Sequence, residues 1–149
     1  MKKFEFTLSK MLDYKDQVLD KEKNALMQLR NQKNKIDEKI LSLENEAVRV
    51  GNQYQEESQK GITAIQIRCY DFQLENIRRQ VAQLKQEQKV MAIAVERQLQ
   101  VVIALSQEVS GLDKLQEKQL EEYNYLQARA DETFISEYIS GNLIRQKQA

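Results

Sequence analysis

The chain has 149 residues, and its 23 lysines and arginines are balanced by 23 aspartates and glutamates. Charged residues make up 31% of the chain and aromatic residues 7%, so a compact globular core is not expected, and no excess of basic charge points to nucleic acid or anionic lipid. The sequence has no histidine and one cysteine, Cys69, which excludes the usual zinc sites, histidine-dependent nucleophilic catalysis and an internal disulfide. We therefore predict a non-enzymatic protein with no metal site and no cofactor.

The first long segment, residues 8–59, repeats apolar side chains every three and four positions and contains no proline. This spacing predicts one helix of a coiled coil, about 75 Å long at about 1.5 Å per residue. Its two seam rows are Leu12, Leu19, Leu26, Lys33, Ile40, Ala47 and Tyr54, and Leu8, Lys15, Glu22, Leu29, Ile36, Leu43 and Val50.

A bend is predicted at residues 60–64, where Lys60-Gly61-Ile62-Thr63 interrupts the apolar repeat. The residues that follow, up to Leu74, are richer in apolar and aromatic side chains than a two-stranded seam requires. This enrichment favours a short separate helix near the bend.

The second long helix is predicted over residues 65–140, with Gly141 as its stop and residues 142–149 as a frayed polar tail. It is some twenty residues longer than the first helix, so its end either overhangs or folds back. Its seam is Tyr70, Leu74, Ile77, Val81, Leu84, Gln88, Met91, Val95, Gln98, Val102, Leu105, Val109, Leu112, Gln116, Gln119, Tyr123, Leu126 and Ala130.

The predicted fold class is all-α: an antiparallel two-helix coiled-coil hairpin that forms a single elongated domain over residues 1–149. A connection of a few residues can join neighbouring helices but cannot return the chain to the far end of the first helix, so both termini should lie at the same end. Polar seam positions near that end either loosen the pairing or fix its register: Lys15, Glu22, Gln116 and Gln119.

Two clusters contain more apolar surface than the seam uses, and each either caps an end of the coil or forms a docking site. The cluster at the bend consists of Tyr54, Ile62, Ile65, Ile67, Tyr70 and Phe72. In the cluster at the termini, Phe4, Phe6, Met11 and Tyr14 are expected to meet Tyr125, Phe134, Ile135, Tyr138 and Ile139.

No apolar run approaches the eighteen or so residues of a membrane span, and residues 1–6 lack the apolar core of a secretory signal. These features predict a cytoplasmic protein without direct membrane insertion.

The chain resembles the FliJ family, small coiled-coil proteins of the flagellar type III export apparatus. The resemblance extends over nearly the whole chain and rests on three groups of residues. They are the opening Phe4-x-Phe6-x-Leu8-x-x-Met11-Leu12-x-Tyr14, the bend Gly61-Ile62 followed by Tyr70-Asp71-Phe72, and the late Leu112-x-x-Leu115-x-Glu117-Lys118-Gln119 with Tyr123. Where the family often has an acidic pair, this chain has Ser136-Glu137.

The resemblance implies a stalk similar to the central stalk subunit of rotary ATPases, located at the inner-membrane export apparatus. Its partners would be the hexameric export ATPase, the cytoplasmic domain of the export-gate membrane protein and export chaperones. The ATPase-docking tip would comprise Phe4, Phe6, Met11, Tyr14, Phe134 and Tyr138. The gate-binding surface would comprise Leu43, Ala47, Val50, Tyr54, Gln73, Ile77, Gln80 and Leu84, several of which are also seam positions.

Two alternatives remain open from the residues alone. One is the equivalent stalk of a virulence type III secretion system or of a rotary ATPase. The other is a cytoskeletal or scaffold coiled coil that assembles with itself, since the same seam could also pair between two chains.

Overall fold

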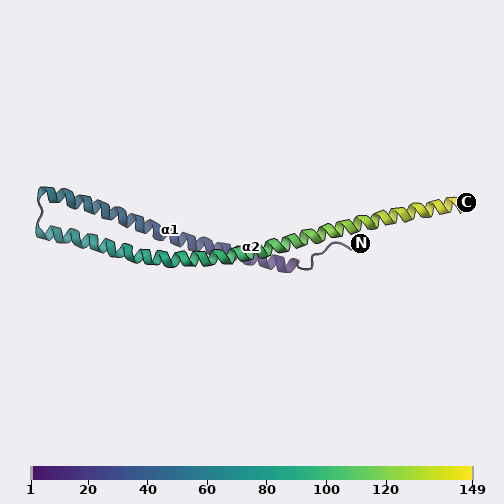
Figure 1. Cartoon of the computed structure of the whole chain (residues 1–149), viewed down its shortest axis with the longest axis horizontal. Helices are drawn as coiled ribbons and strands as arrows, with labels where there is room; N and C mark the ends of the chain where they lie inside the picture. Colours follow the sequence, from purple (N-terminus) through teal and green to yellow (C-terminus); the bar gives the residue numbers. More distant parts are fainter. Residues whose placement is uncertain (1, 149) are drawn as a thin grey trace. The chain divides into compact units, whose positions relative to one another are not determined.

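The computed structural model describes residues 2–148, in which the secondary structure consists of two α-helices, α1 (Ser9–Lys60) and α2 (Ala64–Gln148) (Figure 1). The described chain contains no β-strand. The residues form two compact units. Asp20–Ile103 form one unit, called here the hairpin unit; residues up to Leu19 and from Ala104 onward form the other, called here the terminal unit. The single domain expected from the sequence stays a prediction.

In the hairpin unit, α1 and α2 pair through a seam of aliphatic side chains. Leu26, Ile40, Val50 and Val102 are 4 to 9% exposed, and each is a residue of the predicted seam. The seam positions between them in sequence are buried or half-buried without exception. The period of 3.5 residues keeps one face of each helix turned toward the other, so the prediction of an all-α coiled-coil hairpin is confirmed.

Polar contacts across the seam set the direction and register of this pairing. The Gln98 amide donates hydrogen bonds to the backbone oxygen of Glu22 at 3.0 Å and to its carboxylate at 2.5 Å, and the Gln88 amide donates to the Asp37 carboxylate at 2.5 Å. As residue numbers rise along α1 they fall along α2, so the helices are antiparallel. Glu22, one of the predicted polar seam positions, thus has a partner, as expected for a residue that fixes register.

Three residues, Gly61, Ile62 and Thr63, connect the two helices. Gly61 has a φ of 95°, in the left-handed region that favours glycine, and its N–H donates to the Ser58 oxygen at 3.3 Å. At the start of α2, the Gln66 N–H donates to the Thr63 hydroxyl at 3.2 Å, while the Thr63 N–H donates to the Gln66 side-chain oxygen at 2.9 Å. These reciprocal bonds form a capping box.

The short separate helix expected near the bend is not formed, and that prediction is wrong. From Ala64 onward α2 continues without interruption through the apolar residues that suggested it. The capping box satisfies the first free N–H groups, and the segment after it contains neither proline nor glycine before Gly111, so nothing ends the helix there.

In the terminal unit, α1 pairs with α2 through Leu12, Leu19 and Val109, which are 6 to 7% exposed. The Lys15 ammonium lies 2.7 Å from the Glu108 carboxylate, so this polar seam position also has a partner. Before α1, a non-helical segment over residues 2–8 packs on the pair and buries Phe6 to 6%. The Ser9 N–H donates to the Phe6 oxygen at 3.1 Å, which forms the turn that leads into α1.

The end of α2 differs from the prediction. The helix continues past Gly141 to Gln148, so residues 142–148 of the predicted tail are helical, and Ala149 lies outside the described residues. Gly141 does not adopt the left-handed backbone that ends α1 at Gly61. The predicted seam is followed as far as Tyr123, but Leu126 and Ala130 are exposed and not seam residues.

Candidate functional site

Residues 124–140 of α2 are exposed without exception, which makes the last part of α2 the most open apolar surface of the terminal unit. This segment is the yellow end of α2 in Figure 1. Between half and three quarters of each large apolar side chain here is exposed: Tyr125, Leu126, Phe134, Ile135, Tyr138, Ile139, Leu143 and Ile144. Leu143 and Ile144 were missed from the sequence because the helix was predicted to end before them.

The N-terminal aromatic residues pack on the chain itself. The rings of Phe4 and Tyr123 lie 5.5 Å apart, and the Tyr123 hydroxyl donates to the backbone oxygen of Lys2. Phe4 is half-buried and Phe6 is buried. Tyr123 was expected as a seam residue and as part of the family resemblance, and no sequence signal marks its bond to the Lys2 backbone.

The six residues assigned to the ATPase-docking tip differ in exposure. Phe4 and Phe6 face inward, whereas Met11 and Tyr14 are 49% and 64% exposed. Phe134 and Tyr138 are 71% and 64% exposed. Within residues 2–148, the ring contact of the N-terminal aromatics is with Tyr123 and none joins them to the rings after it, so the expected meeting of the two sets stays a prediction. Phe4 packs on Tyr123, earlier along α2.

Most of the residues assigned to the gate-binding surface belong to the seam of the hairpin unit. Gln73 and Gln80 are exposed. The others are buried or half-buried: Leu43, Ala47, Val50, Tyr54, Ile77 and Leu84. A partner at this surface would therefore meet the two glutamines and the rims of the apolar side chains.

At the bend, the rings of Tyr54 and Tyr70 stack with centroids 4.9 Å apart and planes 28° apart. The Tyr70 hydroxyl donates to the Glu57 carboxylate, and this hydrogen bond, aided by desolvation, raises the pKa of Tyr70 to about 12. Ile65 and Phe72, also of the expected bend cluster, are each 73% exposed, and Cys69 beside them is an exposed free thiol. The bend cluster is thus divided between a packed pair and an open face.

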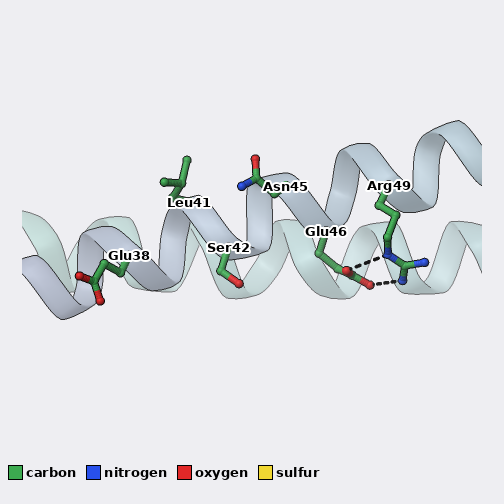
Figure 2. A pocket seen from close by; sticks show the side chains of 6 residues that line it. All are labelled: Glu38, Leu41, Ser42, Asn45, Glu46 and Arg49. Carbon is green, nitrogen blue, oxygen red and sulfur yellow. Dashed lines mark hydrogen bonds and ion pairs between the residues drawn. The ribbon is translucent and has the colours of Figure 1, made fainter.

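Figure 2 shows a shallow hollow on the outer side of α1, lined by Glu38, Leu41, Ser42, Asn45, Glu46 and Arg49. Two of its charged side chains, Glu46 and Arg49, form an ion pair with each other. The Arg49 guanidinium donates to the Glu46 carboxylate, and this hydrogen bond is the main reason that the pKa of Glu46 lies below its usual value. An open hollow with a paired carboxylate has none of the enclosure that acid–base catalysis requires.

No group of three or more histidine, cysteine, aspartate or glutamate side chains among residues 2–148 is arranged to hold a metal ion. Over the same residues, no helix is both long enough and apolar enough to cross a membrane.

Two helices paired through an aliphatic seam, with exposed apolar side chains at the end of α2, define a coiled-coil protein with a surface of the kind that binds other proteins. A family model described as "Flagellar FliJ protein" matches residues 4–148, nearly the whole chain. The chain therefore belongs to the FliJ family and is a component of the flagellar protein export apparatus. Comparisons with curated proteins and with solved structures gave no match.

Proposed function

We propose that this chain is a stalk or escort protein that works by binding: it docks into the export ATPase ring and couples the ring to the export gate and to export chaperones. It would act in the cytoplasm, at the periphery of the inner-membrane export apparatus. The observation that carries the proposal is the uncovered end of α2. Eight large apolar side chains between Tyr125 and Ile144 are open to solvent, in the part of α2 where residues 124–140 are exposed without exception.

Exposure of this kind costs solubility and contributes nothing to folding, so it is typical of a binding surface. Phe134, Ile135, Tyr138 and Ile139 form a stripe along this helix, so the wall of a ring pore could contact the helix along its length. Met11 and Tyr14, which are also exposed in the terminal unit, would extend the contact. Phe4 and Phe6 would act indirectly, by holding residues 2–8 on α2.

The hairpin unit would provide the second contact, with the export gate. Gln73 and Gln80 are the exposed members of the assigned gate-binding set and would make its polar contacts. Coupling would then be mechanical: the ATPase ring binds the end of α2, the gate binds the hairpin unit, and the two continuous helices join both contacts.

The test is ATP hydrolysis by the purified export ATPase with and without this protein, with ring formation followed by light scattering in the same samples. We expect stimulation that saturates near one chain per six ATPase subunits. The double variant Phe134→Ala with Tyr138→Ala should need at least about tenfold more protein for half-maximal stimulation, because buried aromatic anchors dominate most interfaces.

Phe72→Ala is the matched control, because Phe72 is as exposed as Phe134 but belongs to the hairpin unit. It should stimulate like the unmodified chain. If the unmodified chain neither stimulates nor binds the ATPase at micromolar concentrations, the proposal is wrong. Polymerisation of the chain without the ATPase would favour a scaffold instead.

A further inference from the structure

The uncovered end of α2 is acidic in its first part and basic in its last turn, where Arg145 and Lys147 lie. Residues 121–140 contain the carboxylates Glu121, Glu122, Asp131, Glu132 and Glu137. Arg129 is the one basic residue in this range. Its guanidinium lies 5.9 Å from the centroid of the Tyr125 ring, at the start of the segment. The negative charge of this segment is therefore not balanced locally.

The carboxylates frame an apolar stripe made of Phe134, Ile135, Tyr138 and Ile139. Residues three or four apart on a helix are neighbours, so Asp131 adjoins Phe134 and Ile135 at the beginning of the stripe. Glu137, three residues after Phe134, lies along one edge. On the other edge, Glu132 lines a shallow open hollow together with Ile135, Ser136, Ile139 and Ser140.

Arg129 lies one turn before Glu132, but among the described residues the two form no ion pair. Within the described part of the chain, the ion pairs involve other residues, and none includes Asp131, Glu132 or Glu137. All three are exposed. An apolar stripe with unpaired acidic edges is complementary to an apolar groove with basic edges.

We propose that the end of α2 binds a groove in the ATPase ring that is apolar at its centre and lined by lysine or arginine at its edges, with Asp131, Glu132 and Glu137 as the contacts that set orientation and association rate. This inference rests on the proposed function and specifies the chemistry of its partner surface.

The same charges argue against two other occupants of the stripe. A second copy of this chain, paired in parallel, would bring its own carboxylates against these, and like charges across an interface are unfavourable. An antiparallel copy would bring Arg145 and Lys147 toward them instead, and the experiment below includes it as an outcome. An anionic membrane surface would repel them as well. A basic-edged protein groove is the occupant in which both the apolar and the charged groups gain partners.

The experiment measures the dissociation constant for purified ATPase at several salt concentrations. It compares the unmodified chain with a triple variant, Asp131→Asn with Glu132→Gln and Glu137→Gln, which removes the charges and keeps the side-chain shapes. The control is a triple variant in the hairpin unit, Glu56→Gln with Asp71→Asn and Glu87→Gln, whose carboxylates are also exposed. Circular dichroism checks that helix content is the same in all three proteins.

We expect binding of the unmodified chain to weaken as salt rises, because exposed charges are screened. At low salt the triple variant at residues 131–137 should bind about tenfold more weakly, mainly through slower association, and its dependence on salt should be much reduced. The control variant should behave like the unmodified chain.

The outcomes separate this inference from the proposed function. If the unmodified chain binds and stimulates the ATPase without any dependence on salt, and the triple variant is equal to it, the inference is overturned and the proposed function stands. If the unmodified chain does not bind the ATPase, both the proposed function and this inference are wrong. Sedimentation showing that the chain pairs with itself would make a second copy the occupant and would also overturn the inference; stronger pairing of the triple variant would indicate a parallel copy, and weaker pairing an antiparallel one.

Discussion

Ile40 and Ile139 are the same side chain on two long helices of one chain, but Ile40 is 7% exposed and Ile139 is 52% exposed. Ile40 lies in the seam of the hairpin unit, where α1 and α2 cover each other. Ile139 lies on α2 beyond its last paired residues. Apolar side chains therefore have two separate uses in this protein, and only the first stabilises the fold.

The comparison also shows why a helix can persist without a partner. Starting a helix is costly, but each further residue adds one backbone hydrogen bond. Nucleation takes place in the paired part of α2, so residues 124–148 only extend an existing helix. Packing is required to establish α2, whereas its extension depends on sequence propensity.

The largest expected effect is on stability, from the same substitution made in the two regions. Ile40→Ala should lower the free energy of unfolding by about 2–4 kcal/mol, because it removes buried methyl groups and leaves a cavity in the seam. Ile139→Ala should change it by less than about 0.5 kcal/mol, as at other exposed positions. Urea unfolding followed by circular dichroism measures both.

Leu41→Ala is the control within α1, since Leu41 is adjacent to Ile40 but 58% exposed. Its effect should resemble that of Ile139→Ala. Equal losses for Ile40→Ala and Ile139→Ala would mean that the end of α2 is covered in solution, and the contrast between the two regions would fail.

A smaller effect is expected at the N-terminal segment. Phe6→Ala should destabilise its packing by less than the about 3–5 kcal/mol typical of a buried phenylalanine, because residues 2–8 pack against one side of the helix pair. Helix content should hardly change, because this segment is not helical. Amide hydrogen exchange of residues around Ser9 and limited proteolysis near the N-terminus should both become faster.

Phe4→Ala is the comparison for that measurement, and its effect should be smaller because Phe4 is half-buried and contacts Tyr123 in a tilted ring pair. If Phe6→Ala leaves exchange and proteolysis unchanged but weakens ATPase stimulation, Phe6 binds the ATPase directly, and the inward orientation assigned to it is wrong.

The smallest effect concerns pH at the bend. The bond to Glu57 raises the pKa of Tyr70 to about 12, above the ordinary tyrosine value of about 10. Because the folded state holds this proton more tightly, the bond contributes stability that is fully present below about pH 10 and is lost as pH rises toward about 12. Absorbance of tyrosinate near 295 nm should show a late step that disappears in Tyr70→Phe.

Glu57→Gln tests the stated cause, since it removes the negative charge that holds the proton on Tyr70. The late step should move to lower pH in this variant. A late step that is unaffected by either substitution would belong to another tyrosine and would remove the Tyr70–Glu57 bond from the description of the bend.

The sequence was sufficient for the seam because one physical rule governs it. A row such as Leu12, Leu19 and Leu26 repeats every seven residues, and burial follows this period directly. The same rule places Gln98 in the seam, although it does not predict that its amide bonds to Glu22. Periodicity therefore predicts which face is buried, while individual polar partners depend on the register of the two helices.

The sequence prediction failed where local signals compete. Apolar enrichment after Gly61 suggested a separate helix, but the Thr63-x-x-Gln66 pattern of a capping box was the better signal and marks the start of α2. Gly141 suggested a stop, but glycine costs only about 1 kcal/mol inside a helix, and the residues after it continue the helix. The inward packing of Phe6 could not be read from periodicity, because residues 2–8 are not helical.

The three-residue connection between α1 and α2 also has a consequence for the order of folding. Tyr70 and Glu57, next to Gly61, are 13 residues apart in sequence, whereas Gln98 and Glu22 are 76 apart, and Tyr123 and Lys2 are 121 apart. Closing a short loop costs less entropy than closing a long one. We therefore expect the two helices to begin pairing at the connection and to add contacts toward the termini. The N-terminal segment should then pack last during folding and detach first during unfolding.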